Sequence, residues 1–440
     1  MIIQMSNTQH NLQSKVNGQR LFAWLVFLLF AVPVCLNVLK ELMSLKHLSY
    51  QSWEISDWLI NYESGFVRRG LMGELLWLAE QVHPFDVRLA IVAICALSSI
   101  VVLGILINLF RKEGWAMLVL PTGLFLGFTF FNLWARRDML SLAMTYWVFL
   151  AFRNALDRRG GHAAWIVFHA LSVLQLLIHE SSFFYTFPVL MVYSYNVSSA
   201  RGRTVMGCLA DVVSRFLPAL SVMALVCIFK GDQGMAEAIW ASWADVFNAF
   251  PADASAAELG EGVKALGWNT WETFYNHLYT SYLGCYHPTW WGVPMSLFNL
   301  VATYYLLTRI DAVDMGIYPA RAADYTRLSN IALVQFIAIM PMFTVLSCDW
   351  GRTLPYLVIS SLFFYHLFAR SEVTVAPRLT PASSRLQGWI TRSSVLSSPY
   401  TYILVVLLTP FPRYQIPFDS MNTFQQKFIE AAGSLIQLFS

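Results

Sequence analysis

Apolar stretches separated by short polar gaps are the feature that most limits how this chain can fold. A helix that crosses a membrane needs about 20 mainly apolar residues. Stretches of or near that length occur at 21–39, 88–110, 115–131, 139–153, 163–178, 182–196, 213–229, 291–308, 329–347, 354–369 and 397–411. Charged residues make up 12% of the chain, about half the share of a typical soluble domain. The pattern therefore predicts an all-α, polytopic membrane protein with about eleven transmembrane helices.

The first apolar stretch follows a polar N-terminus that contains Lys15 and Arg20. It is longer than the core of a signal peptide and has no small-residue cleavage site, so we interpret it as a retained first helix. The sequence shows no internal repeat, and we expect a single transmembrane domain over residues 1–440.

The distribution of lysine and arginine predicts the orientation of these helices. With the N-terminus inside, seventeen of the 29 basic residues and seven of the 26 acidic residues fall in inner segments. The remaining twelve basic and nineteen acidic residues fall outside. The chain is therefore expected to begin in the cytoplasm and to end on the outer side. The segment 377–398 is expected to be an inner linker.

Two outer loops are long, at 40–87 and 230–290. Within the first, 61–82 has an apolar stripe and is expected to form an amphipathic surface helix. The second is rich in tryptophan, and we expect it to be helical. Its mid-loop tryptophans either form an aromatic belt at the membrane boundary or stack on sugar rings; they are Trp240, Trp243, Trp268 and Trp271.

Six cysteines are spread along the chain. Those in or beside apolar stretches are expected to be small core residues; they are Cys35, Cys95, Cys208 and Cys227. Cys285 and Cys348 fall in outer loops, and the sequence leaves open whether they form a disulfide. No metal-binding signature such as CxxC or HExxH occurs, so we expect no metal site and no cofactor.

Four charged clusters lie on the outer side in this orientation, each in a different gap between apolar stretches. They are 57–70 (DWLINYESGFVRRG), 136–138 (RRD), 179–180 (HE) and 349–352 (DWGR). Their arginines lie where the positive-inside bias disfavours them. This placement indicates that the arginines hold a specific anion.

The first cluster combines the carboxylates of Asp57 and Glu63 with the adjacent arginines Arg68 and Arg69. The planar fork of an arginine matches two phosphate oxygens. Neighbouring residues on a helix point about 100° apart, so we expect one arginine to hold phosphate and the other to pair with Glu63 or Asp57. The alternative is a solvated loop with internal ion pairs.

The second cluster holds Arg136, Arg137 and Asp138 in a short outer turn. Arginines at helix ends often anchor in lipid headgroups, but that role is typical of the inner side. We therefore expect at least one of the two arginines to be functional. Asp138 is in position to cap the amides of the following helix.

The third and fourth clusters add a histidine, an arginine and two carboxylates. His179 exchanges protons near neutral pH or donates to phosphate when charged; alternatively it is a buried histidine beside Glu180, which caps the next helix. Arg352 completes a phosphate site and is oriented by Asp349, or the two bridge each other across one turn.

Together the clusters predict a site that binds a diphosphate and activates a hydroxyl. Arginines stabilise the charge of the leaving group, and a carboxylate acts as general base. A proton channel would place its charges in mid-membrane instead. No P-loop or GxGxxG signature occurs, and we expect no nucleic-acid partner.

The motifs GFVRRGL, RRD, HESSFFYTFP and DWGR, with the topology of the whole chain, resemble bacterial O-antigen and capsule polymerases. More distantly, the chain is similar to GT-C glycosyltransferases, which also place acids in the first outer loop. The resemblance implies a metal-independent inner-membrane enzyme with a periplasmic site. It would transfer a glycan from an undecaprenyl-diphosphate carrier to a sugar hydroxyl of a lipid-linked acceptor. Membrane lipids and a chain-length regulator are the further partners it implies.

Carried over to this sequence, the resemblance implies roles for the residues of the four clusters. The base would be Asp57 or Glu63, with His179 and Glu180 nearby. Asp138 and Asp349 would support the site. The diphosphate would contact Arg68, Arg69, Arg136, Arg137 and Arg352.

Two other functions remain open from the sequence. A flippase or transporter of lipid-linked oligosaccharide predicts charged residues along the spans, of which the sequence has few. A membrane O-acyltransferase predicts an essential residue on an inner loop, where an acyl donor would arrive.

Overall fold

The computed structural model of the chain describes residues 48–113, 136–157, 161–251, 258–269, 271, 301–302, 304–305, 328–342, 350–368, 373, 375, 380–398, 400–401 and 404–405. Only the backbone is described for 107, 109–113, 329, 350–355, 380, 383, 387 and 391. Every regular element within these residues is a helix. The expected all-α class is therefore confirmed for the described part of the chain.

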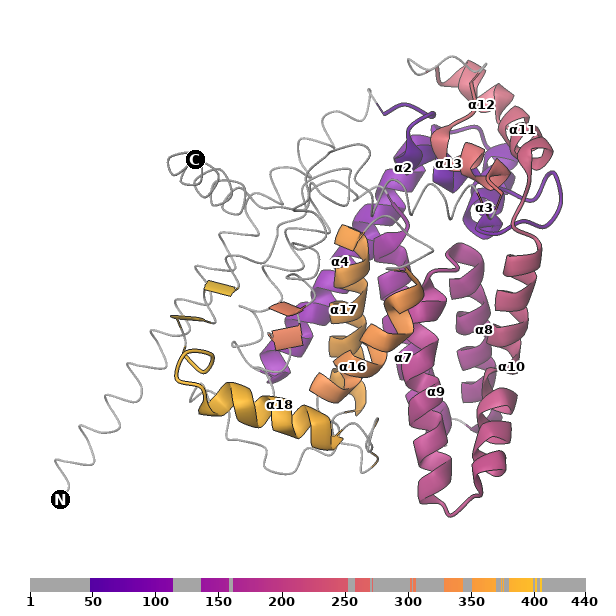
Figure 1. Cartoon of the computed structure of the whole chain (residues 1–440). Coiled ribbons are helices and arrows are strands. Elements are labelled where there is room, and N and C mark those ends of the chain that lie inside the picture. The colour runs from indigo at the N-terminus through magenta and orange to yellow at the C-terminus, as the bar shows by residue number, and fades with distance from the viewer. Residues whose placement is uncertain are drawn as a thin grey trace, which may run out of the picture.

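The long helices lie side by side and form a bundle (Figure 1). They are α4 (Val87–Glu113), α7 (Asp138–Leu156), α8 (Gly161–Ile178), α9 (Ser182–Ala200), α10 (Val205–Ile228), α16 (Leu328–Pro341) and α17 (Trp350–Phe368). Four stretches are long and apolar enough to cross a membrane: Val87–Leu106, Asp138–Leu156, Gly161–Ile178 and Val205–Ile228. The structure thus supports a polytopic membrane protein, while the expected total of eleven spans stays a prediction.

Each expected span that falls within the described residues overlaps an observed helix. The expected stretches 21–39 and 115–131 lie outside the described residues, and 291–308 and 397–411 lie mostly outside them. Helix α10 begins at Val205, earlier than the expected 213. Arg215 therefore lies inside the helix and not at its start. Its guanidinium pairs with Asp211 (3.7 Å) and donates to Ser194 of α9 (2.8 Å).

Short helices from the two long loops pack together at one end of the bundle (Figure 1). They are α2 (Trp53–Ser56), η2 (Asp57–Leu59), α3 (Gly70–Val82), α11 (Gln233–Ala241), α12 (Ala244–Ala249), α13 (Glu261–Lys264) and η4 (Ala265–Gly267). We call this group the cap. It has its own apolar core, shared with the first turns of α4. The cap holds the first charged cluster against the bundle.

Two of the mid-loop tryptophans belong to that core, whereas Trp271 is exposed. Trp240 and Trp243 are buried, and the Trp243 indole donates to the carbonyl of Leu59 (2.8 Å). These two residues are therefore structural, and the belt and sugar-stacking interpretations are both wrong for them. The sequence does not indicate this contact, because Trp243 and Leu59 are more than 180 residues apart in the chain.

Two glycines allow the outer loops to approach closely. A Cβ at Gly73 would overlap the carbonyl of Ile60, and a Cβ at Gly262 would lie 2.5 Å from the backbone nitrogen of Asp57. The first contact packs α3 onto η2, and the second packs α13 onto η2. Any side chain at either position would push the backbone around Asp57 away.

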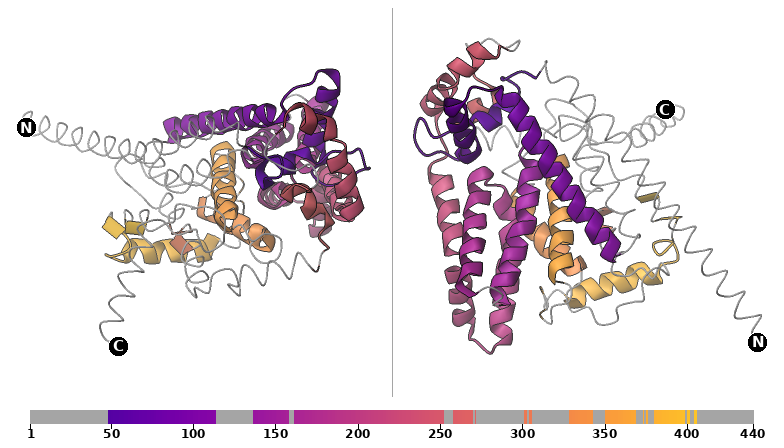
Figure 2. Two further views of the ribbon diagram at one scale, coloured as in Figure 1. Left: turned by 90° about the horizontal axis from the view of Figure 1, so that it is seen from above. Right: turned by 180° about the vertical axis from the view of Figure 1, so that it is seen from behind.

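Three other expectations need correction. The helix expected at 61–82 begins at Gly70, because a turn closes at Gly65 and Arg69 adopts a left-handed backbone with φ +64°. The expected linker 377–398 contains the helix α18 (Thr380–Arg392), which lies at the opposite end of the bundle from the cap (Figure 2). Finally, Cys95 and Cys208 are buried, but Cys227 is exposed.

Candidate functional site

Three of the four predicted clusters meet between the cap and the bundle. Arg69 of the first cluster contacts Glu180 of the third, and Arg137 of the second contacts Asp57 of the first. Asp57 lies in η2 and Arg69 just before α3. Arg137 lies just before α7, and Glu180 lies between α8 and α9. The charged residues therefore converge in space although they come from three separate gaps.

Arg137 is the most buried member of the site, with a side chain that is 0% exposed. Its guanidinium donates to the carbonyls of Arg69 (2.6 Å) and Ile178 (3.0 Å), and also to the carbonyl of Asp57. Its Nε lies 3.3 Å from the Asp57 carboxylate, and the group stacks over the Trp58 ring. Arg137 thus joins the first outer loop to the ends of α7 and α8.

Arg69 forms the strongest ion pair of the site. Its Nε and Nη2 donate to the Glu180 carboxylate at 2.6 to 2.9 Å, and its Nη1 reaches Asp57 at 3.3 Å. Paired forks of this kind are short and directional. The pairing outweighs the cost of the left-handed backbone at Arg69, which is unfavourable for a residue with a Cβ.

Arg68 is held more loosely than its neighbour. It donates to the carbonyl of Ala265 in η4 (3.2 Å), and its Nη1 lies 4.0 Å from Glu180. Its side chain is 27% exposed, more than any other arginine of the site. Its Nε is buried and has no hydrogen-bond partner among the described residues. Arg68 therefore has unused donor capacity.

Arg136 contacts α2. Its guanidinium is 3.8 Å from the Glu54 carboxylate and stacks over the Trp53 ring. Trp53 in turn contacts Trp268, next to η4, with ring centroids 6.0 Å apart. Because Arg68 donates a hydrogen bond to Ala265 in η4, the segment 265–268 contacts Arg68 directly and lies next to Arg136 through Trp53.

His179 and Glu180 form the turn between α8 and α9. The His179 Nδ1 lies 2.7 Å from the Ser181 hydroxyl and 3.9 Å from Glu180. Glu180 does not cap α9, because its carboxylate turns to Arg69 and no side chain caps that helix. The ion-pair interpretation of Glu180 therefore replaces the capping one.

Burial and ion pairing act in opposite directions on the two carboxyls. Burial raises the pKa of Asp57, but Arg137 and Arg69 outweigh it and hold that pKa well below its usual value. Burial likewise raises the pKa of Glu180, and Arg69 with its hydrogen bonds again brings that pKa well below its usual value. Both groups are therefore ionised at neutral pH.

His179 behaves differently. Burial, followed by the nearby charge of Arg69, lowers the pKa of His179 to about 4. The imidazole is therefore neutral at physiological pH. It is able to accept a proton, but it is not the charged phosphate donor considered from the sequence.

The lowered pKa of His179 predicts a pH dependence of stability. His179 takes up a proton near pH 6.5 in the unfolded chain but only near pH 4 in the folded protein. The free energy of unfolding should therefore be highest above pH 6.5 and should fall as the pH drops from 6.5 to 4. We expect His179→Gln to flatten this dependence, measured as the melting temperature in detergent between pH 7.5 and 5. An identical slope in the variant would contradict the assignment.

Some predicted residues lie elsewhere. Glu63 is exposed in the loop before α3 and forms no ion pair with the described residues, so Arg69 pairs with Asp57 and not with Glu63. Asp138 is the first residue of α7 and is buried. The N-cap position of α7 is taken by Arg137, whose side chain makes no hydrogen bond to the first amides of that helix. Asp349 lies outside the described residues, and for Arg352 the backbone alone is described, in the first turn of α17.

The sequence analysis missed Glu54 and the carbonyl of Ala265. Glu54 lies one helical turn before Asp57, and that spacing was the available signal. Nothing in the sequence marks a backbone carbonyl in a loop. Within the described ranges, no three His, Cys, Asp or Glu side chains gather as a metal-ligand set.

The fold and the site define a helical membrane protein with a buried, arginine-rich centre at one end of its bundle. The family model of the uncharacterised membrane protein Rv1490 matches residues 22–256, so the chain belongs to that family. The matched stretch contains the three converging clusters and ends before Arg352. No curated protein and no solved structure matches the chain.

Proposed function

We propose that the protein is a membrane glycosyltransferase of the polysaccharide-polymerase type. It transfers a glycan from an undecaprenyl-diphosphate-linked donor to a sugar hydroxyl of a lipid-linked acceptor. The site faces the periplasm, in a bacterial inner membrane with the N-terminus in the cytoplasm. The observation that carries this proposal is the meeting of arginines from two loops, with Arg68 partly exposed beside Glu180.

The arginines divide into two pairs with different tasks. Arg69 and Arg137 are occupied by Glu180, Asp57 and backbone carbonyls, so they build the site. Arg68 and Arg136 have longer ion-pair distances, 4.0 and 3.8 Å. A diphosphate is a stronger partner for a guanidinium than a carboxylate at that distance. Arg68 is therefore the proposed primary contact of the diphosphate, and Arg136 a second one.

Glu180 is the proposed partner of the acceptor hydroxyl. It is ionised, and its side chain is 16% exposed, compared with 7% for Asp57 and 8% for His179. A carboxylate with a low pKa is a weak base. Glycosyl transfer passes through an oxocarbenium-like transition state, in which the hydroxyl loses its proton late, so a weak base suffices. Asp57 then orients Arg69 and Arg137.

The transporter alternative needs charge along a path through the membrane. In the described bundle, α7, α8 and α9 meet through uncharged groups: Gln175 donates to Thr145 (2.8 Å) and Thr186 (3.0 Å). Asp211 and Arg215 in α10 are ionisable but pair with each other. These contacts favour the enzyme over the transporter.

The direct test is transfer by the purified protein in lipid nanodiscs. Supplied with lipid-linked repeat units alone, the protein should form products of two or more repeats, separable on a gel, because no other component is needed for the reaction. A chelator should leave the yield unchanged. In cells, loss of the protein should leave single repeats on the outer face, whereas loss of a flippase would leave none there. Absence of longer products from an intact, folded preparation would refute the proposal.

A further inference from the structure

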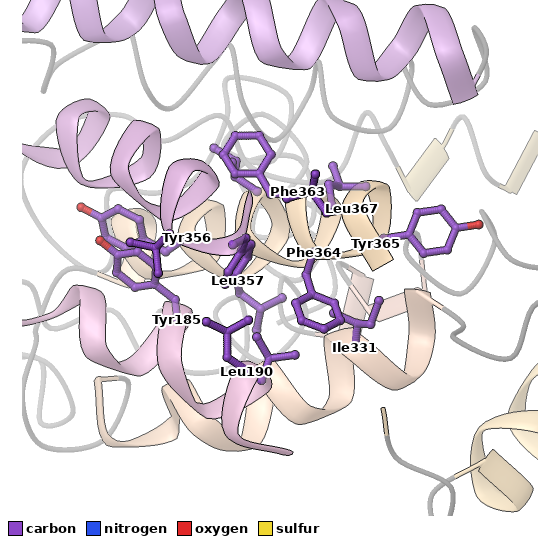
Figure 3. Close-up of a cluster of buried hydrophobic side chains, with 14 of the residues drawn as sticks. Tyr185, Leu190, Ile331, Tyr356, Leu357, Phe363, Phe364, Tyr365 and Leu367 are labelled. Atoms are coloured by element: carbon purple, nitrogen blue, oxygen red, sulfur yellow. The ribbon is translucent and has the colours of Figure 1, made fainter. Parts of the chain in front are cut away.

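Two stacked tyrosines lie beneath the charged site. Tyr185 of α9 and Tyr356 of α17 have ring centroids 4.5 Å apart and an angle of 5° between the rings. They are 0% and 3% exposed. Figure 3 shows both hydroxyls on the same side of the pair, away from the cluster that contains Phe363 and Phe364.

The tyrosine pair is close to His179 and Glu180. Backbone hydrogen bonds from Ser182 to His179 and from Phe183 to Glu180 continue the 179–181 turn directly into α9. Tyr185 follows Glu180 by five residues, which is about 7 Å along a helix axis. Long side chains on helices lean toward the N-terminus. The hydroxyls therefore point back toward the charged site.

The start of α17 lies at the same level. In Figure 3 the labels run along α17 from Tyr356 to Leu367, and both hydroxyls lie at the Tyr356 end of this run. The backbone of Arg352 precedes Tyr356 by one helical turn. The stacking of the two rings therefore brings the first turn of α17, which carries the Arg352 backbone, beside the first turn of α9.

Two polar groups in this region have no hydrogen-bond partner among the residues that the structure describes. The Tyr356 hydroxyl and the Ser182 hydroxyl, which is 0% exposed, are buried and make no hydrogen bond within the described part of the chain. A buried hydroxyl without a partner is destabilising, by about 1–3 kcal/mol. Such groups are rare in folded proteins, and each calls for an explanation, of which a functional role is one.

We propose that Tyr185 and Tyr356 form the membrane-side wall of the anion site, and that the Tyr356 hydroxyl donates a hydrogen bond to a phosphate oxygen of the bound ligand. This inference rests on the proposed function, because it takes the diphosphate held by Arg68 as that ligand. The arginines contact the diphosphate from the cap, and the tyrosine contacts it from the bundle. Tyr356 is thus a binding residue, and the ring of Tyr185 positions it.

The test is Tyr356→Phe, which removes the hydroxyl and keeps the stacked ring. Binding of undecaprenyl diphosphate without sugar, measured in nanodiscs, should weaken about tenfold or more, since a hydrogen bond to a charged group is lost. The melting temperature of the ligand-free variant should equal or exceed that of the wild type, because an unpaired buried hydroxyl has been removed. Inorganic pyrophosphate is the second probe, and the wild-type affinities for the two probes distinguish a lipid headgroup from a free anion. In Tyr356→Phe, the binding of both probes should weaken if the contact is to phosphate.

Tyr193→Phe is the matched control. Tyr193 is a buried tyrosine two turns further along α9, packed against Phe364 and Phe368, and its variant should bind like the wild type. A lower melting temperature for ligand-free Tyr356→Phe, or unchanged binding of both probes, would overturn this inference and leave the proposed function standing. If the wild-type protein bound neither probe, the inference and the proposed function would both fall.

Discussion

Replacing Arg137 with alanine should destabilise the protein more than any other change at the site. The substitution leaves three backbone carbonyls without their donor and removes one of the two arginines that hold the buried carboxylate of Asp57. Breaking a buried pair in this way costs about 3–5 kcal/mol. We expect the cap to detach from the bundle, seen as rapid proteolysis in the loop before α3 and a lower melting temperature in detergent.

Arg137→Lys should not restore stability, because a lysine cannot present donors to three carbonyls at once. Arg153→Ala is the control on the same helix. Arg153 is 38% exposed and lies 3.9 Å from Asp157, and an exposed pair of this kind contributes at most about 1 kcal/mol. A variant at Arg137 as stable as the one at Arg153 would show that the hydrogen bonds of Arg137 are not what joins the cap to the bundle.

Arg68→Ala should have the largest effect on activity with little effect on stability. The Arg68 side chain is partly exposed and makes one hydrogen bond to the described residues, to Ala265. Removing one donor that stabilises developing charge lowers the rate by about 10²–10³-fold. We therefore expect transfer from the lipid-linked donor to fall by that factor, measured in nanodiscs, with the melting temperature unchanged. Arg68→Lys should recover part of the rate, since it keeps the charge but loses the fork.

Lys264→Ala is the matched control for Arg68. Lys264 is an exposed cation of the cap, next in sequence to the residue that accepts the Arg68 hydrogen bond. Its removal lowers the net charge of the cap by the same amount, so equal losses in the two variants would indicate a general electrostatic effect rather than a diphosphate contact. Full activity of Arg68→Ala would rule out the role proposed for it.

The convergence of the clusters could be predicted from the sequence because topology depends on local properties. Once the positions of the apolar stretches and the positive-inside bias are known, every second gap lies on the same side. This reasoning placed the first three clusters on one face. The structure joins them through the ion pairs of Arg69 with Glu180 and of Arg137 with Asp57. It also predicted helices in the regions of α4, α7 to α10, α16 and α17.

Which of the two adjacent arginines forms the ion pairs could not be predicted. Arg68 and Arg69 are adjacent and chemically identical, and only the left-handed backbone at Arg69 turns one toward Glu180 and leaves the other at the edge. The same holds for Trp243, whose hydrogen bond to Leu59 joins two outer loops that are distant in sequence. Tyr356 carried no signal at all, since its unpaired hydroxyl is a property of its surroundings.

The sequence by itself determined that this is a multi-pass helical membrane protein and which loops carry its charged residues, because hydrophobic length and charge bias act segment by segment. Only the tertiary structure decided which arginine neutralises which carboxylate, which tryptophans are buried and which polar groups remain available. Those outcomes depend on distances between residues far apart in the chain, and electrostatic and hydrogen-bond energies change steeply over a few ångströms.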